Sequence, residues 1–284
     1  MKSIVYILLA VFISTILLSA FPKVGIASSK TIVLQCTESY SDEKLNQSVE
    51  ILKARLESFG LDKFEVKGKK GKQSIEVVIE SAVNESEIVS LLTSKGKLEF
   101  YETIDKSIIT DQLSKSDELY SLMNIPGDGS GSEAILGYSR EKNRSKVETL
   151  IETNLIPGVK DSNIQFAWSK FPVDDLGWAL FLLKNNSLLS GKYVAESIAN
   201  SENTYVMINF NEEGSKIWKN MTARNINRAI AIVIDNEVYS APMVRAAIEH
   251  GKCQISGDFS TTEVNRLVAF IDSGELPLEF KVVK

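Results

Sequence analysis

Two residue types that support much catalytic and metal chemistry are scarce in this chain. Its 284 residues include 1 histidine and 2 cysteines. A His-rich metal site is therefore excluded, and the spacing of Cys36 and Cys253 fits no zinc pattern. A nucleophilic triad would have to use His250, which lies between Glu249 and Gly251, and the sequence has no serine nucleophile elbow. We predict that the protein is not an enzyme and holds no cofactor.

Only one long apolar run is present. Residues 4–21 are apolar except for two serines and one threonine, and eighteen residues as a helix would span roughly 27 Å, enough for the hydrocarbon core. Residues 1–29 are interpreted as a signal anchor or as a signal peptide cleaved near the small residues 25–27. The run exceeds the ~7 to 15 residues of a signal-peptide core, which favours the anchor. We expect a single-pass inner-membrane protein with a periplasmic body, or alternatively a protein secreted to the periplasm.

Positive charge is also in deficit. Residues 28–284 carry 30 basic and 37 acidic side chains, which gives a net charge of −7. Nucleic acid demands a basic face because its backbone is a row of phosphates, so we predict no nucleic-acid partner. The same deficit argues against peripheral docking on anionic lipid, so that contact with a membrane is expected through the N-terminal helix.

The two cysteines leave two alternatives open. In an oxidising compartment, Cys36 and Cys253 could form a disulfide, because both fall in predicted strands that are candidates to be neighbours. The other interpretation is that they are two small buried residues that never meet. The sequence does not decide between these alternatives.

The first part of the body predicts a βαββαβ unit. A helix capped by Ser41 ends at Gly60, and a second helix begins at Asn84 and ends at Gly96. Strands rich in β-branched residues surround these helices, at residues 31–36, 64–67, 74–80 and 97–102. This order is typical of a ferredoxin-like base subdomain, so the predicted fold class is α+β.

A head subdomain is predicted as an insertion into this base. After the polar middle of the chain, a capping box of Ser260 and Glu263 opens a helix that ends at Gly274, and a strand follows at residues 278–283. These last elements return the chain to the base. The predicted organisation is a base over residues 30–104 and 252–284, with an inserted α+β head over residues 105–251.

The most distinctive local pattern is a hairpin in the last third of the chain. The β-branched run 230–234 is followed by Asp235-Asn236, and a second short strand ends before Pro242. Both turn residues tolerate positive φ, which a two-residue hairpin turn requires. We therefore predict a tight hairpin centred on Asp235 and Asn236.

This hairpin and several flanking motifs resemble the large periplasmic domain of the SecD/SecDF protein-export family. The strand, acidic-glycine turn and helix of residues 207–218 are similar to that family, as are the Met-Thr-x-x-Asn of residues 221–225 and the run 248–259. Near the front, residues 51–60 and 96–100 resemble the first half of the same domain. The resemblance covers residues of about 31–104 and 186–284, and it indicates a first periplasmic domain with base and head.

The resemblance implies a role beside the protein-translocation channel. In SecD the head is thought to contact preprotein leaving the channel, while membrane helices couple this contact to proton flow. Because the chain ends at Lys284, we expect a stand-alone form without proton-conducting helices, whose partners are Sec translocase membrane subunits and unfolded preprotein. The alternative is a stand-alone periplasmic peptide-binding or structural module that is unrelated to translocation.

Aromatic side chains in the predicted head are the candidates for binding extended polypeptide. The candidate substrate-binding residues are Trp168, Tyr193, Tyr205 and Tyr239. The competing interpretation, that such residues are ordinary core, is favoured for Trp218 because it shares a helix face with Met221. Exposed strand edges could also bind a peptide by strand addition.

Overall fold

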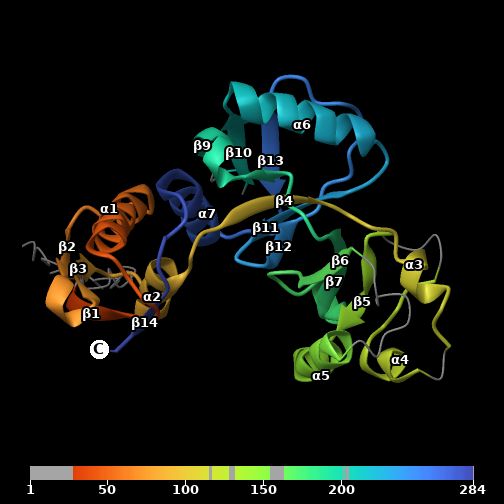
Figure 1. Ribbon diagram of the computed structural model, residues 1–284, viewed down its shortest axis with the longest axis horizontal. Helices are drawn as coiled ribbons and strands as arrows, with labels where there is room; N and C mark the ends of the chain where they lie inside the picture. Colours follow the sequence, from red (N-terminus) through yellow and green to blue (C-terminus); the bar gives the residue numbers. More distant parts are fainter. Residues whose placement is uncertain are drawn as a thin grey trace, which may run out of the picture.

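The computed structural model describes residues 28–114, 117–127, 132–153, 163–200, 202 and 205–283. They form three lobes (Figure 1). The predicted signal anchor or signal peptide lies outside the described residues, apart from positions 28 and 29. Within the described ranges, no helix combines the length and apolar character needed to cross a membrane.

One lobe, which we call the base, contains an antiparallel sheet of order β14-β1-β3-β2 with α1 and α2 packed against it (Figure 1). Its mixture of helix and sheet agrees with the predicted α+β class. The base consists of β1 (Ser28–Cys36), α1 (Asp42–Ser58), β2 (Phe64–Lys69), the 3-10 turn η1 (Lys70–Lys72), β3 (Ser74–Ser81), α2 (Glu85–Thr93) and β14 (Phe280–Val282).

Local signals set the starts of three helices. The hydroxyl of Ser41 accepts a hydrogen bond from Lys44 N, and the side chain of Asn84 accepts one from Ser86 N. Helix α7 (Thr261–Ser273) begins with the predicted capping box of Ser260 and Glu263. Each cap satisfies a backbone N–H that has no partner within the helix. The three predicted helix starts are confirmed.

The fourth strand of the base sheet differs from the prediction. β4 (Leu98–Glu102) pairs with β11 (Ile230–Ile234) and β8 (Leu189–Ser190) in a separate sheet, and β14 lies beside β1 instead. All residues of β4 are buried, as in a strand whose sheet is covered on both faces. The prediction that residues 97–102 complete the first βαββαβ unit is therefore wrong. The chain leaves the base after α2 and returns with β14.

A second lobe, the upper lobe, contains α6 and two sheets (Figure 1). The sheet of order β12-β11-β4-β8 is the central sheet, and the other has the order β13-β10-β9. Strand β13 begins after residue 251, the predicted end of the head, and pairs with β10 of the upper lobe. By strand pairing, the head therefore extends past residue 251. The further elements are η3 (Gly191–Tyr193), β9 (Val194–Asn200), β10 (Tyr205–Phe210), α6 (Glu212–Arg224), β12 (Glu237–Ser240) and β13 (Lys252–Ser256).

The predicted hairpin is confirmed between β11 and β12. Asp235 and Asn236 have φ values of 51° and 66°, and Ile234 pairs with Glu237 across the turn. Two successive positive φ values match the twist of a two-residue hairpin. Asp235 lies at the end of this hairpin that is nearest to the linker between α2 and β4, since its N–H donates to Lys97 O at 3.2 Å.

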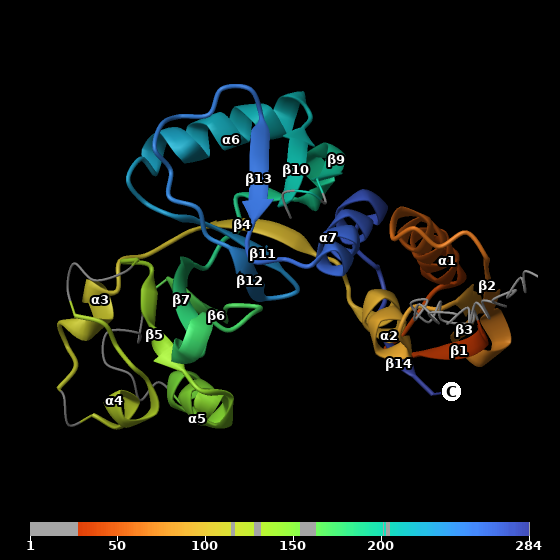
Figure 2. The same cartoon turned by 180° about the vertical axis from the view of Figure 1, so that it is seen from behind.

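The central sheet is covered on both faces, which explains its uniformly apolar strands. On one face the ring of Phe100 lies 5.4 Å from that of Phe210 and 5.6 Å from that of Trp218, both nearly edge-on. Trp218 is buried, as predicted. On the other face Tyr101 and Val233 pack with Phe181 of the neighbouring sheet. Figure 2 shows the central sheet between the rest of the upper lobe and the lower lobe.

The lower lobe contains a three-stranded sheet of order β5-β7-β6 with helices beside it (Figure 2). We call the upper and lower lobes together the head. The elements of the lower lobe are α3 (Ser107–Thr110), α4 (Glu118–Leu122), β5 (Ile135–Ser139), α5 (Glu141–Glu152), β6 (Ile164–Trp168), the 3-10 turn η2 (Asp174–Leu176) and β7 (Trp178–Lys184).

Candidate functional site at the junction of base and head

Two short segments near each other connect the lobes. Residues 94–97 lead from α2 to β4, and residues 274–279 lead from α7 to β14. Gly96 and Gly274 have φ values of 72° and 79°, in the left-handed region that favours glycine. Leu276 N donates to Lys95 O at 2.8 Å, so the outgoing and returning segments lie side by side.

Arg55 of α1 is fully buried and binds both segments. It caps the C-terminal ends of α2 and α7, where carbonyls lack helical donors and the helix dipole is negative. The planar guanidinium has five N–H donors in a fixed arrangement, which suits several acceptors at once. The acceptors are Leu91 O at 3.1 Å, Ser94 O at 2.6 Å, Lys95 O at 3.0 Å, Gly274 O at 3.0 Å and Ser273 Oγ at 3.2 Å.

The charge of Arg55 is retained in this site. Burial lowers the pKa of Arg55 to about 10, and the negative charge of Asp235 acts in the opposite direction. The guanidinium is therefore protonated at neutral pH. Its carbon also lies 4.9 Å from the ring centre of Phe270, a distance at which a cation and an aromatic face attract.

The head holds the same linker from the other side. The carboxylate of Asp235 accepts hydrogen bonds from Gly96 N at 3.0 Å and from Lys97 N at 2.9 Å. Hydrogen bonds to a carboxylate are stronger than those between neutral groups. The residues between α2 and β4 are thus fixed by Arg55 of the base and by Asp235 of the head.

Substitution of Gly96 tests this arrangement. In Gly96→Ala, the new Cβ would lie 2.8 Å from Arg55 Nη2, at a backbone conformation that is strained for alanine. We expect a loss of about 2–3 kcal/mol of unfolding free energy, because backbone strain and displacement of the buried guanidinium add together. The matched control is Gly60→Ala, which has φ +96° but no atom within 4 Å of the added Cβ. Urea denaturation of both variants should show a clearly larger loss for Gly96→Ala, and equal losses would contradict the prediction.

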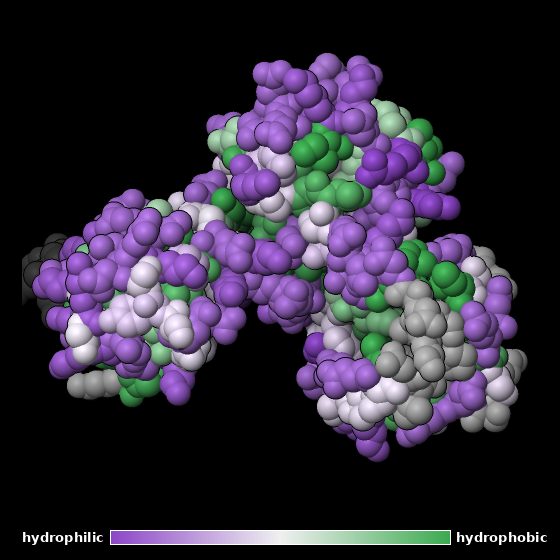
Figure 3. Space-filling model, in the orientation of Figure 1, coloured by the Kyte–Doolittle hydropathy of each residue, from purple (hydrophilic) through white to green (hydrophobic). Residues whose placement is uncertain are grey.

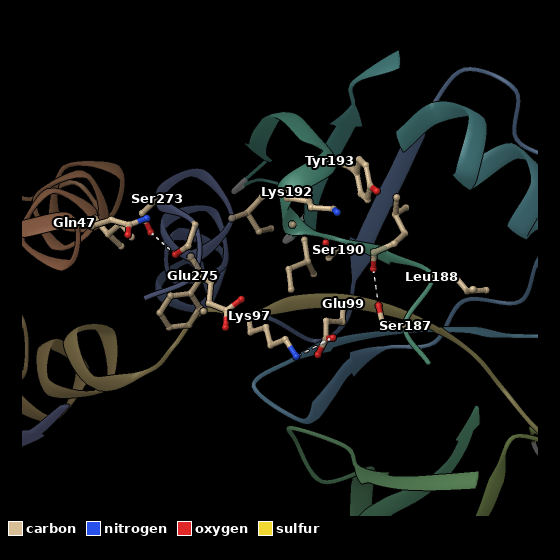
Figure 4. Close-up of a pocket in the computed structure, with 18 residues that line it drawn as sticks. Gln47, Lys97, Glu99, Ser187, Leu188, Ser190, Lys192, Tyr193, Ser273 and Glu275 are labelled. Carbon is tan, nitrogen blue, oxygen red and sulfur yellow. Dashed lines mark hydrogen bonds and ion pairs between the residues drawn. The ribbon is translucent and has the colours of Figure 1, made fainter. Parts of the chain in front are cut away.

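A cavity of about 730 Å³ opens at this junction. Figure 4 shows Gln47 and Glu275 on one side of it, Ser190, Lys192 and Tyr193 on the other, and Lys97 and Glu99 below. Its volume falls within the range of ordinary ligand pockets. The lining comes from α1, from the last turn of α7 with residues 274–275, from residues 96–99 and from the segment 187–193.

The cavity borders the open edge of a sheet. β8 pairs with β4 on one side and is the last strand of the central sheet among the described residues. Because residues 187–193 line the cavity, this edge is next to the open space. An unpaired strand edge offers backbone N–H and C=O groups to another extended chain.

Charges of both signs lie on the cavity wall. Lys97 Nζ is 3.0 Å from Glu99 Oε1, and the hydrogen bond between them raises the pKa of Lys97. Lys192 Nζ lies 4.6 Å from the ring centre of Tyr193. The wall therefore presents charges of both signs and an aromatic ring, not a field of one sign.

The sequence comparisons agree in one family. Residues 170–278 match the family described as the P1 head subdomain of SecDF. The protein translocase subunit SecD of Calditerrivibrio nitroreducens is 28% identical over 247 residues, which cover 86% of this chain and 40% of that protein. SecD of Acidaminococcus fermentans is 35% identical over 136 residues, 45% of this chain and 31% of that protein. Together these matches make the chain similar to the first periplasmic domain of the SecD/SecDF family.

Solved SecDF structures have the same fold. A crystal structure of SecDF in a super-membrane-facing form matches with a TM-score of 0.55 and 21% identity, covering 92% of this chain and 30% of that one. A structure of SecDF as a membrane component that enhances protein export matches with a TM-score of 0.51 and 20% identity, covering 90% and 98%. The chain spans about two fifths of the length of curated SecD relatives such as those of Calditerrivibrio nitroreducens and Rickettsia typhi.

The SecDF P1 head match covers part of the junction site. Asp235, Ser273 and Gly274 lie within residues 170–278, whereas Arg55 lies outside them. The site is therefore built partly from the matched head and partly from α1 of the base.

The four aromatic candidates are spread over the head of this SecD-like chain. Tyr193 lines the junction cavity. Trp168 is buried in the lower lobe, where its Nε1–H donates to Glu148 at 2.9 Å. Tyr205 accepts a hydrogen bond from Asn200 Nδ2 at 3.0 Å at the start of β10. In the described part of the chain, no ring contact joins any two of the four.

Tyr239, the remaining candidate, is half-buried against other aromatics. Its ring centre lies 6.0 Å from that of Phe171, and burial raises the pKa of its hydroxyl, with nearby carboxylates such as Glu237 adding to the effect. These contacts fix the loop after β6 against β12. Whether any of the four aromatic residues binds a substrate stays a prediction.

The cysteines lie in different sheets. Cys36 is in β1 of the base and Cys253 is in β13 of the upper lobe, and both are buried free thiols. Burial raises the pKa of Cys253 to about 12, which keeps its thiol protonated and unreactive. The arrangement is that of two small buried residues, and the disulfide left open by the sequence is not formed.

Two residues at the centre of the junction were missed as site residues. Arg55 falls in the apolar face of α1, between Leu52 and Leu56, which are both fully buried. A charge in that position is a sequence signal for a buried, paired group. Asp235 was predicted only as a turn residue, because the linker that it binds is remote in the sequence.

Proposed function

We propose that this chain acts as a SecD-like accessory of bacterial protein translocation on the periplasmic side. The observation that carries the proposal is the junction cavity beside the open edge of β8, in a chain that matches SecD and the SecDF head. The bound species is an extended segment of emerging preprotein, with Sec translocase membrane subunits as the neighbouring partners.

The chemistry of the cavity supports a peptide ligand. A preprotein segment that adds to β8 would pair its backbone with the free edge, which requires no particular sequence. Tyr193, Leu188 and Ile51 provide apolar lining, and the Lys97–Glu99 pair supplies polar contacts. Recognition by backbone pairing is suited to many different clients, as a translocation accessory requires.

Site-specific photocrosslinking tests this proposal. A photoreactive residue at Ser190 should capture a preprotein arrested during translocation, because position 190 borders the cavity. The same residue at Lys146, which is exposed on α5 of the lower lobe, serves as the control and should capture at most a tenth as much. Ser190→Trp, which places a large side chain beside the cavity, should reduce capture from a probe at Lys192 about tenfold.

Equal capture at positions 190 and 146 would contradict binding at the junction. Recovery of Sec membrane subunits with the tagged full chain would support the translocase association, independently of the cavity. Absence of both preprotein and Sec subunits would favour the alternative of a periplasmic module unrelated to translocation.

A further inference from the structure

An unusual surface lies at the C-terminal end of α6, which we call the arginine face: Arg224, Ile226, Arg228, Met243 and Arg245. Asn227 N donates to Val244 O at 2.8 Å and Val244 N donates to Arg228 O at 2.9 Å, so residues 226–229 run beside residues 242–245. In both views this end of α6 points away from the base (Figures 1 and 2). The arginine face is therefore separate from the junction cavity.

Two of its three arginines are not neutralised locally, whereas Arg224 pairs with Glu102. Within the described part of the chain, the side chains of Arg228 and Arg245 are exposed and make no hydrogen bond or ion pair. The lysines of the same helix differ, because Lys216 pairs with Glu212 and Lys219 pairs with Glu249. The sequence has no acidic residue at positions 214–234 or 238–248. The positive charges of Arg228 and Arg245 thus stay without a local counter-charge in a protein of net charge −5.

Large apolar side chains accompany this charge. Ile226 is 46% exposed and Met243 is 41% exposed, whereas Val244 between Met243 and Arg245 is buried and anchors the segment. Most of the surface visible in Figure 3 is hydrophilic, with apolar side chains gathered in a few places on the upper and lower lobes. Methionine and arginine are both enriched in protein–protein interfaces.

We infer that the arginine face binds a polypeptide segment of another protein that presents acidic side chains beside apolar ones. Charge complementarity selects the acidic partner, and the exposed Ile226 and Met243 require an apolar component. Nucleic acid is disfavoured because the protein as a whole is acidic. Anionic lipid is disfavoured because three arginines fall short of the clusters of about four to eight basic residues that bind such surfaces.

Fluorescence anisotropy with the full chain tests the inference. The probe is a short labelled peptide of glutamate, leucine and serine, compared with one in which lysine replaces glutamate and one in which serine replaces leucine. We expect the glutamate–leucine peptide to bind at least tenfold more tightly than either of the others. Binding should weaken with added salt, since the charges are exposed.

Two pairs of charge reversals assign the binding to this surface. Arg228→Glu with Arg245→Glu should weaken binding of the glutamate–leucine peptide at least tenfold. Lys142→Glu with Lys146→Glu, on exposed positions of α5, makes the same change of net charge and should alter binding less than about twofold. Ile226→Ser with Met243→Ser should weaken binding about fivefold or more, and these exposed positions tolerate serine without loss of the fold.

Three results would overturn the inference. Equal weakening by both pairs of reversals would show that net charge alone controls binding. Equal affinity for the serine-substituted peptide would remove the apolar component. Binding to phosphatidylserine vesicles through Arg228 and Arg245, without binding of any peptide, would assign the face to lipid. None of these results bears on crosslinking at Ser190, so the junction proposal can fail or stand separately.

Discussion

Replacing Arg55 with methionine is expected to lower the free energy of unfolding by about 3–5 kcal/mol. The side chain is 0% exposed and donates to five oxygens at the ends of α2 and α7. Methionine fills much of the same volume but donates nothing. Each buried acceptor that loses its donor costs about 1–3 kcal/mol. The total for five acceptors is smaller than the sum, because water that enters the junction donates hydrogen bonds to some of them.

Conservative and matched variants separate hydrogen bonding from packing. Arg55→Lys keeps a positive charge but cannot reach the acceptors of both helices with one ammonium, so we expect an intermediate loss. Lys53→Met removes a charge from the same helix, where Lys53 forms an exposed pair with Glu50, and should cost less than about 1 kcal/mol. Urea denaturation of the full chain, followed by far-UV circular dichroism, measures all three. An Arg55→Met loss no larger than that of Lys53→Met would contradict the role of Arg55.

Local chemistry explains which elements the sequence could predict. The starts of α1, α2 and α7 depend on Ser41, Asn84 and Ser260, which act within a few residues. The β11–β12 hairpin depends on two adjacent residues of positive φ. Each of these features is decided by neighbours in the chain, so each was visible in the sequence.

The strand that pairs with β4 could not be predicted from the sequence, because this pairing depends on residues remote in the chain. Residues Leu98 to Glu102 of β4 are equally compatible with the base sheet and with a sheet in the head, since an apolar strand has no intrinsic partner. The choice depends on β11, whose residue Ile232 lies opposite Phe100. All residues of β4 are buried in the central sheet, which is covered on both faces, and burial of apolar side chains favours this position over an exposed sheet edge.

The same limit applies to the junction site. The acceptors of Arg55 lie between 36 and 219 residues further along the chain, so no motif could reveal them. Aromatic residues were instead chosen by type, and the structure places them in separate surroundings, with Tyr193 at the cavity and Trp168 in a core. Composition identified candidate residues, but their association depends on tertiary packing.

Glu102→Gln is expected to cost about 2–3 kcal/mol at neutral pH and to change how stability depends on acid. The carboxylate of Glu102 is buried at the end of β4, where it is bound by Lys184 of β7 and by Arg224 and Asn225 at the end of α6. Glutamine keeps the shape but loses the negative charge between two cations. One of its oxygens is also replaced by an NH2 group, which cannot accept from Lys184 or Arg224.

The pH window follows from the direction of the pKa shift. Burial alone raises the pKa of Glu102, but hydrogen bonds from Lys184, Arg224 and Asn225 outweigh it and bring the pKa to about 2, below the ordinary 4.5. A lowered folded-state pKa contributes stability that is fully present above the unfolded pKa and is lost as the pH falls through the folded one. The difference in stability between the wild type and Glu102→Gln should therefore be constant above about pH 5 and shrink between about pH 4.5 and pH 2.

An exposed pair on another sheet provides the comparison for this window. Glu65 of β2 forms an ion pair with Lys67, and both side chains are more than half exposed, so Glu65→Gln should cost less than about 0.5 kcal/mol at any pH in the range. A difference in stability between the wild type and Glu102→Gln that stays unchanged down to pH 3 would contradict the linkage.

Because Glu102 joins β4 to β7 and α6, amide exchange in Glu102→Gln should also increase at the end of α6 and along β7 before it does in the base. That order would show that this carboxylate holds the two lobes of the head together, as Arg55 holds the head to the base.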